Sequence, residues 1–113
     1  MRGTVDVVQP DVGRVGRLTE ATRVGLHASD RGLGVVPHCW KSAIGIAASA
    51  HLAAVSPTCT FMEFLPKELA DSTLRRDLCS RKLPVVDGRI PLPKEPGLGV
   101  TINEEALSHF RVA

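Results

Sequence analysis

Short runs of β-branched residues alternate with longer apolar stretches over the first half of the chain. A β-branched run that stops at a proline or a polar residue is typical of a strand, and a longer apolar stretch is typical of the helix that follows it. The expected strands are Val5–Gln9, Gly34–His38 and Thr60–Leu65, and the expected helices are Leu18–Ser29 and a segment that begins near Ser42 and lasts until Pro57. This β, α, β, α, β order predicts an α/β fold with a parallel sheet.

The two expected helices differ in their apolar surface. In Leu18–Ser29 the apolar residues form one stripe, and Gly32 lies where a C-terminal cap is expected. Gly25 inside this segment lowers its helix propensity. The helix that begins near Ser42 is apolar on all sides, so we expect it to be buried, with its small residues allowing close packing.

The chain changes character after Pro66. Residues 67–96 are charged and rich in proline, which favours an irregular crossing segment with one short helix near Ser72–Cys79. Residues 97–113 hold a brief extended piece near Val100–Ile102 and then Asn103, a residue type that caps helices. We therefore expect an α/β unit over residues 1–66, a crossing segment over 67–96, and a returning tail over 97–113 with a helix Glu104–Phe110 that buries Ala106, Leu107 and Phe110.

Composition narrows the class of protein. The 113 residues suffice for one small domain, and the formal net charge of +2, with few aromatic residues, argues against a nucleic-acid partner. The three cysteines form no CxxC pair and no zinc spacing, and an odd count without a signal peptide suggests free thiols in a reducing cytoplasm. The longest apolar run, Ala43–Val55, is too short to span a bilayer core of roughly 30 Å. We expect a cytoplasmic protein with no membrane partner and no metal ligands of its own.

Each of the three expected strands ends in a titratable residue: Asp11, His38 and Glu63. In a parallel α/β fold the carboxyl ends of the strands carry the chemistry. A carboxylate beside an imidazole accepts its N–H and fixes its tautomer, which Asp11 could do for His38. Glu63 lies between Phe61 and Leu65, and a glutamic acid in apolar surroundings can donate a hydrogen bond to a developing oxyanion.

Each of these three residues also has a structural interpretation. An aspartate after proline is most often a turn residue, a histidine after a strand is usually a satisfied structural residue, and Glu63 could point outward. The recurrence of a titratable residue at three successive strand ends favours the functional interpretation over these alternatives.

Four segments resemble the C-terminal part of the enolase superfamily, in its mandelate racemase/muconate-lactonizing branch. They are QPDVGRVG at Gln9–Gly16, PHCWKSAIGIAASAHLAA at Pro37–Ala54, MEFLP at Met62–Pro66 and PGLGV at Pro96–Val100. The resemblance implies an α/β barrel with a capping domain built from both chain ends. The expected strands would then be the sixth, seventh and eighth barrel strands, which makes this chain a partial TIM-type barrel of three parallel strands with flanking helices and an irregular C-terminal tail.

The resemblance also implies a reaction. Family members abstract the proton α to a carboxylate and hold the resulting enediolate with Mg²⁺. By this likeness His38 is the base, or the acid that protonates a departing hydroxyl, Asp11 is its orienting partner, and Glu63 is the donor to the substrate. Trp40 and Lys41 are candidate substrate contacts, with a packing Trp and a solvated Lys as the alternatives. The substrate would be a carboxylate-bearing small molecule, and both sugar-acid dehydratase and hydroxy-acid racemase remain open.

The sequence departs from the family pattern in what it lacks. The strands that supply the family's three Mg²⁺-binding carboxylates and its second base have no counterpart here, and Arg17 stands where the family typically has glycine. We therefore expect this chain to be inactive alone. Three interpretations follow: a C-terminal fragment of a Mg²⁺-dependent enzyme, which we favour; one chain of a split enzyme with a complementing partner; and a non-catalytic interaction module that associates with itself through open sheet edges.

Overall fold

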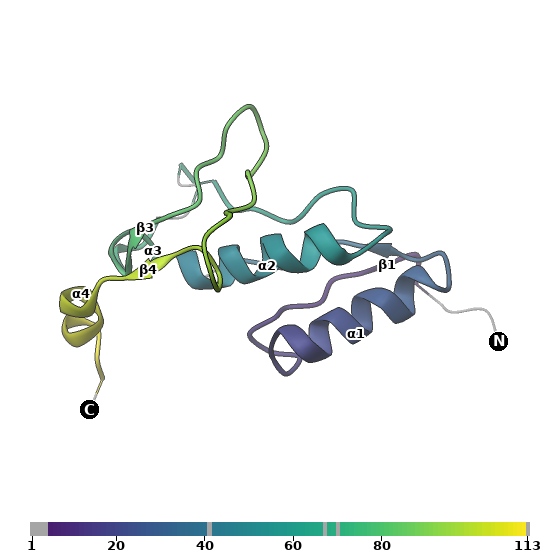
Figure 1. Ribbon diagram of the computed structural model, residues 1–113, viewed down its shortest axis with the longest axis horizontal. Helices are drawn as coiled ribbons and strands as arrows, with labels where there is room; N and C mark the ends of the chain where they lie inside the picture. Colours follow the sequence, from purple (N-terminus) through teal and green to yellow (C-terminus); the bar gives the residue numbers. More distant parts are fainter. Residues whose placement is uncertain (1–4, 41, 67, 70, 113) are drawn as a thin grey trace.

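A computed structural model describes residues 5–40, 42–66, 68, 69 and 71–112. Its elements, in chain order, are β1 (Val7–Val8), α1 (Arg17–Ser29), β2 (Gly34–Val35), α2 (Ala43–Val55), α3 (Thr73–Asp77), β3 (Cys79–Arg81), β4 (Thr101–Ile102) and α4 (Glu104–His109). β1 lies near one end of the long axis, and α4 lies at the other (Figure 1). None of the helices in the described part of the chain has the length and apolar character needed to cross a membrane.

β1 and β2 form a parallel pair, in which Val7 pairs with Gly34 and Val8 with Val35. The hydrogen bonding continues beyond the strands, because Val36 N–H donates to the carbonyl of Val8 at 3.0 Å. The α/β character expected from the sequence is therefore present, with α1 as the crossover between two parallel strands.

The third expected strand, Thr60–Leu65, is wrong: the described residues of this segment form no strand. Among the described residues, two backbone hydrogen bonds join the chain from Thr58 onward to β2 and its extension: Val35 N–H donates to Thr58 O at 3.4 Å, and Glu63 N–H donates to Pro37 O at 3.1 Å. From one bond to the next the chain advances by two residues on the β2 side, Val35 to Pro37, and by five on the other, Thr58 to Glu63, so a regular ladder cannot form. Pro37, which has no N–H to donate, removes another ladder bond.

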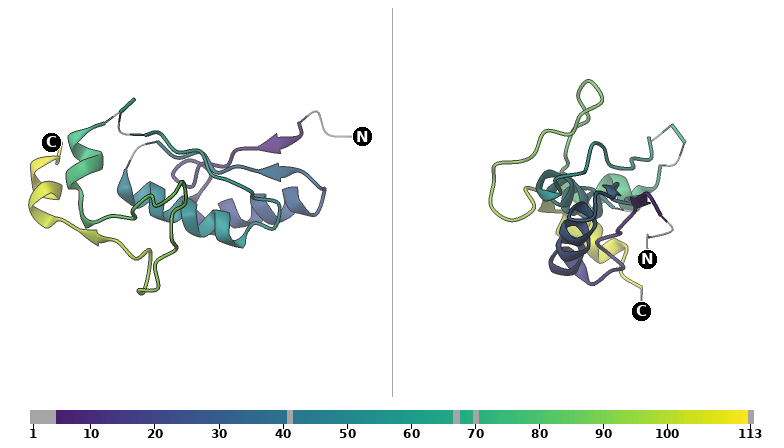
Figure 2. Two further views of the ribbon diagram at one scale, coloured as in Figure 1. Left: turned by 90° about the horizontal axis from the view of Figure 1, so that it is seen from above. Right: turned by 90° about the vertical axis from the view of Figure 1, so that its right-hand side faces the viewer.

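The partial barrel of three parallel strands expected from the sequence is therefore not seen in the described residues. The sheets found there are the two-stranded parallel pair and a separate two-stranded antiparallel pair, β3–β4. The segment before Pro66 nevertheless follows the course of a third strand beside β2, as the views from above and from the end show (Figure 2).

α1 and α2 pack side by side and enclose the main core. The buried cluster comprises Val12, Ala21, Ala48 and Leu52, with Leu18 and Leu98 packed against it. The predicted burial of α2 is confirmed for most of its length, although Val55 at its end is 53% exposed. Ser42 caps α2 by accepting a hydrogen bond from the N–H of Gly45.

The packing of α1 against the end of α2 explains why α1 contains a glycine, Gly25. A Cβ at this position would lie 2.7 Å from Ser56 Oγ at the end of α2. Ser56 is itself buried and donates its hydroxyl to the carbonyl of Leu52 at 2.8 Å. The glycine therefore allows the two helices to approach, which outweighs its low helix propensity.

The C-terminal part returns to the start of α2. Ala43, Leu78 and Cys79 form a second buried cluster, with Ile44, Val100 and Ile102 packed against it. Asn103 caps α4 as expected, by accepting a hydrogen bond from Ala106 N–H at 3.2 Å. Of the three residues expected to be buried by this helix, Ala106 is buried and Phe110 is half-buried. Leu107 is 48% exposed, so the prediction for it is wrong.

Candidate functional site

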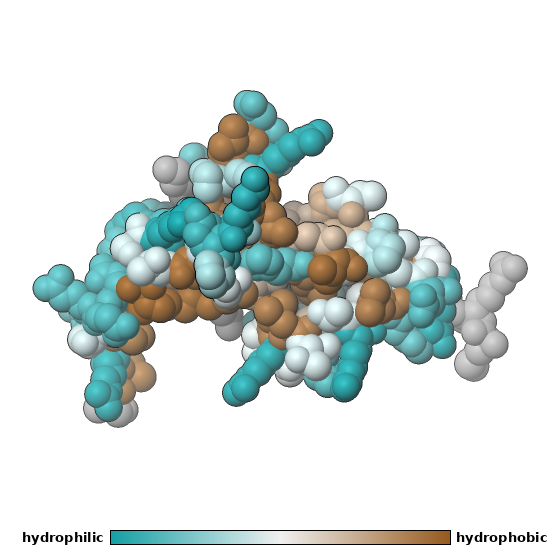
Figure 3. Space-filling view, viewed as in Figure 1, coloured by the Kyte–Doolittle hydropathy of each residue, from teal (hydrophilic) through white to brown (hydrophobic). Residues whose placement is uncertain are grey.

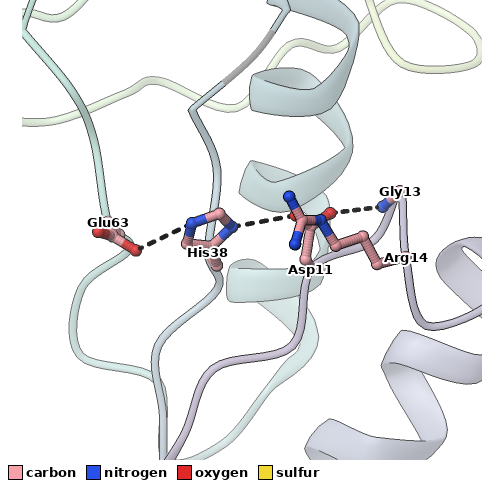
Figure 4. Close-up of polar contacts among 5 residues, drawn as sticks. All are labelled: Asp11, Gly13, Arg14, His38 and Glu63. Atoms are coloured by element: carbon pink, nitrogen blue, oxygen red, sulfur yellow. Dashed lines mark hydrogen bonds and ion pairs between the residues drawn. The ribbon is translucent and has the colours of Figure 1, made fainter.

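Asp11, His38 and Glu63 lie in a line, each on its own segment of chain (Figure 4). Backbone hydrogen bonds hold the three segments in register: His38 N–H donates to Pro10 O at 3.1 Å, and Glu63 N–H donates to Pro37 O at 3.1 Å. The structure thus brings together the three residues that the sequence placed at strand ends, even though regular strand geometry stops earlier.

Asp11 uses its two carboxylate oxygens differently. Oδ1 accepts the N–H of Gly13 at 2.8 Å, which closes a turn, and Oδ2 accepts from Nδ1 of His38 at 3.0 Å. Asp11 therefore closes a turn with one oxygen and contacts the imidazole of His38 with the other.

Arg14 also contacts Asp11. Its Nε lies 3.4 Å from Oδ2, the oxygen that His38 uses. Sequence reasoning missed Gly13 and Arg14. The available signal was the order Asp-x-Gly-Arg, since an aspartate that bonds the N–H two residues on brings the third residue back over its own carboxylate.

Asp11 is held in its ionised form. Burial by itself raises the pKa of Asp11, but the hydrogen bonds from His38 and Gly13 and the charges of His38 and Arg14 together outweigh it, so the pKa lies below its usual value of 3.8. An ionised carboxylate can only accept hydrogen bonds, so Nδ1 of His38 must donate. The neutral imidazole then carries its lone pair on Nε2, the atom on the side of Glu63.

Glu63 faces that lone pair. Its Oε2 lies 3.9 Å from Nε2 of His38, within ion-pair range but beyond hydrogen-bond range. This oxygen is buried and has no hydrogen-bond partner among the described residues. The side chains of His38 and Glu63 remain 26% and 30% exposed, so a small molecule can reach them from solvent.

The ring of Trp40 packs beside the ring of His38. Its centroid lies 5.0 Å from that of the His38 ring, at an interplanar angle of 38°, while the residue stays 48% exposed. Trp40 is thus both a packing residue against His38 and an accessible surface beside it. Lys41, the other candidate substrate contact, lies outside the described residues.

Cys39 anchors the chain directly after His38. It is buried, and burial raises the pKa of its thiol, which a hydrogen bond with Ser49 of α2 only partly offsets. The thiol is therefore protonated at neutral pH and acts as a packing group rather than a nucleophile.

The residues at this site do not fit a magnesium ion. Mg²⁺ requires several oxygen ligands in octahedral geometry, whereas no three His, Cys, Asp or Glu side chains in the described parts of the chain are placed to hold a metal. Both oxygens of Asp11 already accept N–H groups. The arrangement can transfer a proton through His38, and it supplies no metal centre.

A protein-family model described as "Enolase C-terminal domain-like" matches residues 1–106 of this chain. The D-galactarolactone cycloisomerase of Agrobacterium fabrum is 32% identical over 118 residues, which cover 97% of this chain and 30% of that protein. A D-galactonate dehydratase of Xanthomonas euvesicatoria is 32% identical over 112 residues, covering 93% of this chain and 28% of that protein.

Solved structures also match most of this chain and a smaller part of their own length. The 3,6-anhydro-D-galactonate cycloisomerase from Zobellia galactanivorans superposes with a TM-score of 0.82 at 32% identity, over 94% of this chain and 29% of that one. A mandelate racemase/muconate lactonizing enzyme from a Jannaschia species gives a TM-score of 0.81 at 25% identity, over 96% and 27%. The chain therefore spans less than a third of the length of these relatives.

Proposed function

Because this chain belongs to the enolase C-terminal domain-like family, we propose that it supplies the proton-transfer side of an active site for a sugar acid. The observation that carries this proposal is the line of Asp11, His38 and Glu63, in which one imidazole nitrogen is fixed by a carboxylate and the other faces a second, unpartnered carboxyl oxygen. The names of the relatives, a sugar-lactone cycloisomerase and a sugar-acid dehydratase, support this class of substrate.

In this proposal His38 removes the proton on the carbon next to the substrate carboxylate. The C–H bond breaks, Nε2 takes the proton, and the electron pair moves into the carboxylate to give an enediolate. Asp11 stabilises the imidazolium that results, because Nδ1 already donates to its ionised Oδ2. In a dehydration the same imidazolium returns its proton to the departing hydroxyl oxygen.

Glu63 and Trp40 position the substrate in this scheme. Glu63 donates a hydrogen bond to the substrate carboxylate or enediolate, and its distance of 3.9 Å from Nε2 keeps both groups beside the reacting carbon. The exposed face of Trp40 contacts the carbon skeleton of the sugar acid. Lys41, next along the chain, is proposed as a further contact to the substrate.

The enediolate carries more negative charge than these residues can neutralise, since two of the three groups are carboxyls. We therefore propose that the remaining barrel strands, with the ligands for the family's Mg²⁺, come from polypeptide outside these 113 residues, and that this chain alone is inactive. The exposure of Val7 at 50% and Phe61 at 65% supports this arrangement, because both lie on segments that further strands would cover.

The test measures proton exchange rather than one product. The chain is incubated in D₂O with D-galactonate, with D-gluconate and with mandelate, and deuterium at the carbon next to the carboxylate is followed by NMR. The same assay is run on a complex in which the chain is co-expressed with the part of the Agrobacterium cycloisomerase that it does not match. We expect no exchange by the chain alone and exchange of at least one sugar acid by the complex.

Two variants make this test specific. His38→Gln should abolish exchange in the complex, whereas His27→Gln, which alters an exposed histidine of α1, should leave it intact. Exchange catalysed by the isolated chain would refute its inactivity. A well-folded complex in which exchange is absent, or survives His38→Gln, would refute the role of His38.

A further inference from the structure

The side chains of His38 and Arg14 converge on one oxygen of Asp11. Oδ2 lies 3.0 Å from Nδ1 of His38 and 3.4 Å from Nε of Arg14, while Oδ1 is taken by Gly13 N–H at 2.8 Å (Figure 4). The carboxylate therefore has no second free oxygen to offer Arg14, and the guanidinium and the imidazole share one acceptor.

The turn after Asp11 fixes this geometry. Arg14 N–H and Val15 N–H both donate to the carbonyl of Asp11, at 2.9 and 3.0 Å. These bonds, with the side-chain bond to Gly13, bring the stem of Arg14 back over the carboxylate. As an ion pair three residues apart with one side chain 65% exposed, the contact would add little to stability. Its effect is expected instead on His38, which contacts the same oxygen.

The charges around His38 give that effect a direction. The imidazole lies between two carboxyl groups, Asp11 at Nδ1 and Glu63 at Nε2, and the ionised carboxylate of Asp11 attracts positive charge on the ring. Cys39 beside it is a buried neutral thiol, and Trp40 is uncharged. Among the described residues, Arg14 is the cation in ion-pair contact with Asp11, and its charge repels positive charge on His38; Arg75 of α3 acts on Cys39 from a distance and stacks over the ring of Phe64.

We propose that Arg14 is a positioning residue that sets the proton affinity of His38 by competing for Oδ2 of Asp11. With Arg14 in place, Asp11 stays ionised and holds the Nδ1–H tautomer, but its pull on an imidazolium is reduced. Nε2 of His38 is then available to accept a proton from a substrate. This role deepens the proposed function and rests on it, yet the change in proton affinity is measurable without any activity.

The experiment titrates His38 in the full 113-residue chain. Ring resonances of the four histidines are followed by two-dimensional NMR against pH, and His38→Gln identifies the signal of His38. Arg14→Gln should raise the pH midpoint of His38 by a few tenths of a pH unit at low salt. Arg14→Lys, which keeps a charge but cannot reproduce the fork of the guanidinium, should raise it less. At about 1 M salt the difference should become smaller, because the screening length is then about 3 Å, similar to the contact distances themselves.

Arg23→Gln is the matched control. Arg23 pairs with Glu20 on the exposed side of α1, so its loss removes the same charge away from Asp11 and should leave the midpoint unchanged. An unchanged midpoint in Arg14→Gln, an equal shift in Arg23→Gln, or a shift that does not decrease at high salt would overturn the proposal. If Arg14→Gln fails to fold by circular dichroism, Arg14→Lys carries the test.

The outcome is separable from that of the proposed function. In the complemented complex, Arg14→Gln should move the acid limb of the exchange rate to higher pH by the same amount as the NMR midpoint. A midpoint that shifts in the isolated chain while the complex shows no exchange would leave the role of Arg14 standing and the proposed function refuted.

Discussion

Asp11 serves both the turn and the imidazole, and its ionisation therefore links folding to pH. The hydrogen bonds and charges around it lower its pKa in the folded chain below the usual 3.8. A carboxyl of this kind adds stability that is fully present above its unfolded pKa and is lost as pH falls through the folded one. Asp11→Asn should thus destabilise the chain by about 1 to 2 kcal/mol at pH 7 and by much less near pH 3.

Urea unfolding at the two pH values measures this difference. Asp6→Asn removes an exposed carboxylate just before β1 and is the control, for which we expect little change at either pH. A destabilisation by Asp11→Asn that is the same at pH 3 and pH 7 would mean that the charge of Asp11 is not what stabilises the turn.

Trp40 offers an optical readout of its neighbour. It is the single tryptophan in the sequence, and its ring centroid lies 5.0 Å from that of His38. A protonated imidazole quenches indole emission on contact, so the fluorescence of the chain should fall as pH is lowered through the titration of His38. His38→Gln should flatten this transition and His27→Gln should not. The same transition in His38→Gln would show that another group quenches Trp40.

At the scale of elements, the packing of α1 on α2 leads to an unusual expectation for two glycines. Gly→Ala inside a helix normally stabilises by about 0.5–1 kcal/mol, and Gly45→Ala should do so, since its new Cβ would meet atoms no closer than 3.7 Å. Gly25→Ala should instead destabilise by about 1–3 kcal/mol, because its Cβ would lie 2.7 Å from Ser56 Oγ.

A double-mutant cycle tests the cause. Ser56→Ala removes the clashing oxygen, so Gly25→Ala should cost much less in that background when unfolding by urea is compared across the four chains. Equal costs in both backgrounds would place the strain somewhere other than at Ser56.

The same scale shows what the sequence could predict. The apolar periodicity places α1 within one residue of its observed start, and the start of α2 near Ser42 and the cap at Asn103 depend on neighbouring residues only. The absence of the third expected strand could not be predicted in this way, because it depends on how Pro37 and the chain around Thr58 meet across the sheet. The juxtaposition of Asp11, His38 and Glu63 needs only a common register, which two backbone hydrogen bonds supply. The contact of Arg14 depends on the turn Asp-x-Gly-Arg, which the pattern of apolar and polar residues does not reveal.

The whole molecule is less compact than a typical domain of the same length. Its radius of gyration is 15.0 Å, against about 13 Å for a compact domain of this size. Apolar side chains are spread over the middle of one face, above α2 and the crossing segment (Figure 3). Val7 and Phe61 are also exposed, on the two segments that flank β2. Such surfaces are typical of a partner interface.

This openness leads to a prediction about assembly that separates the interface from the fold. Phe61→Lys changes a side chain that is 65% exposed, so it should alter the urea stability of the isolated chain little, yet weaken its binding to the complementing cycloisomerase segment about tenfold or more. Val112→Lys, at a position that is 89% exposed near the end of the chain, is the matched control and should leave binding unchanged. Isothermal titration or sedimentation of the mixed chains measures both. Equal effects of the two substitutions would show that the partner does not bind against the segment that carries Phe61.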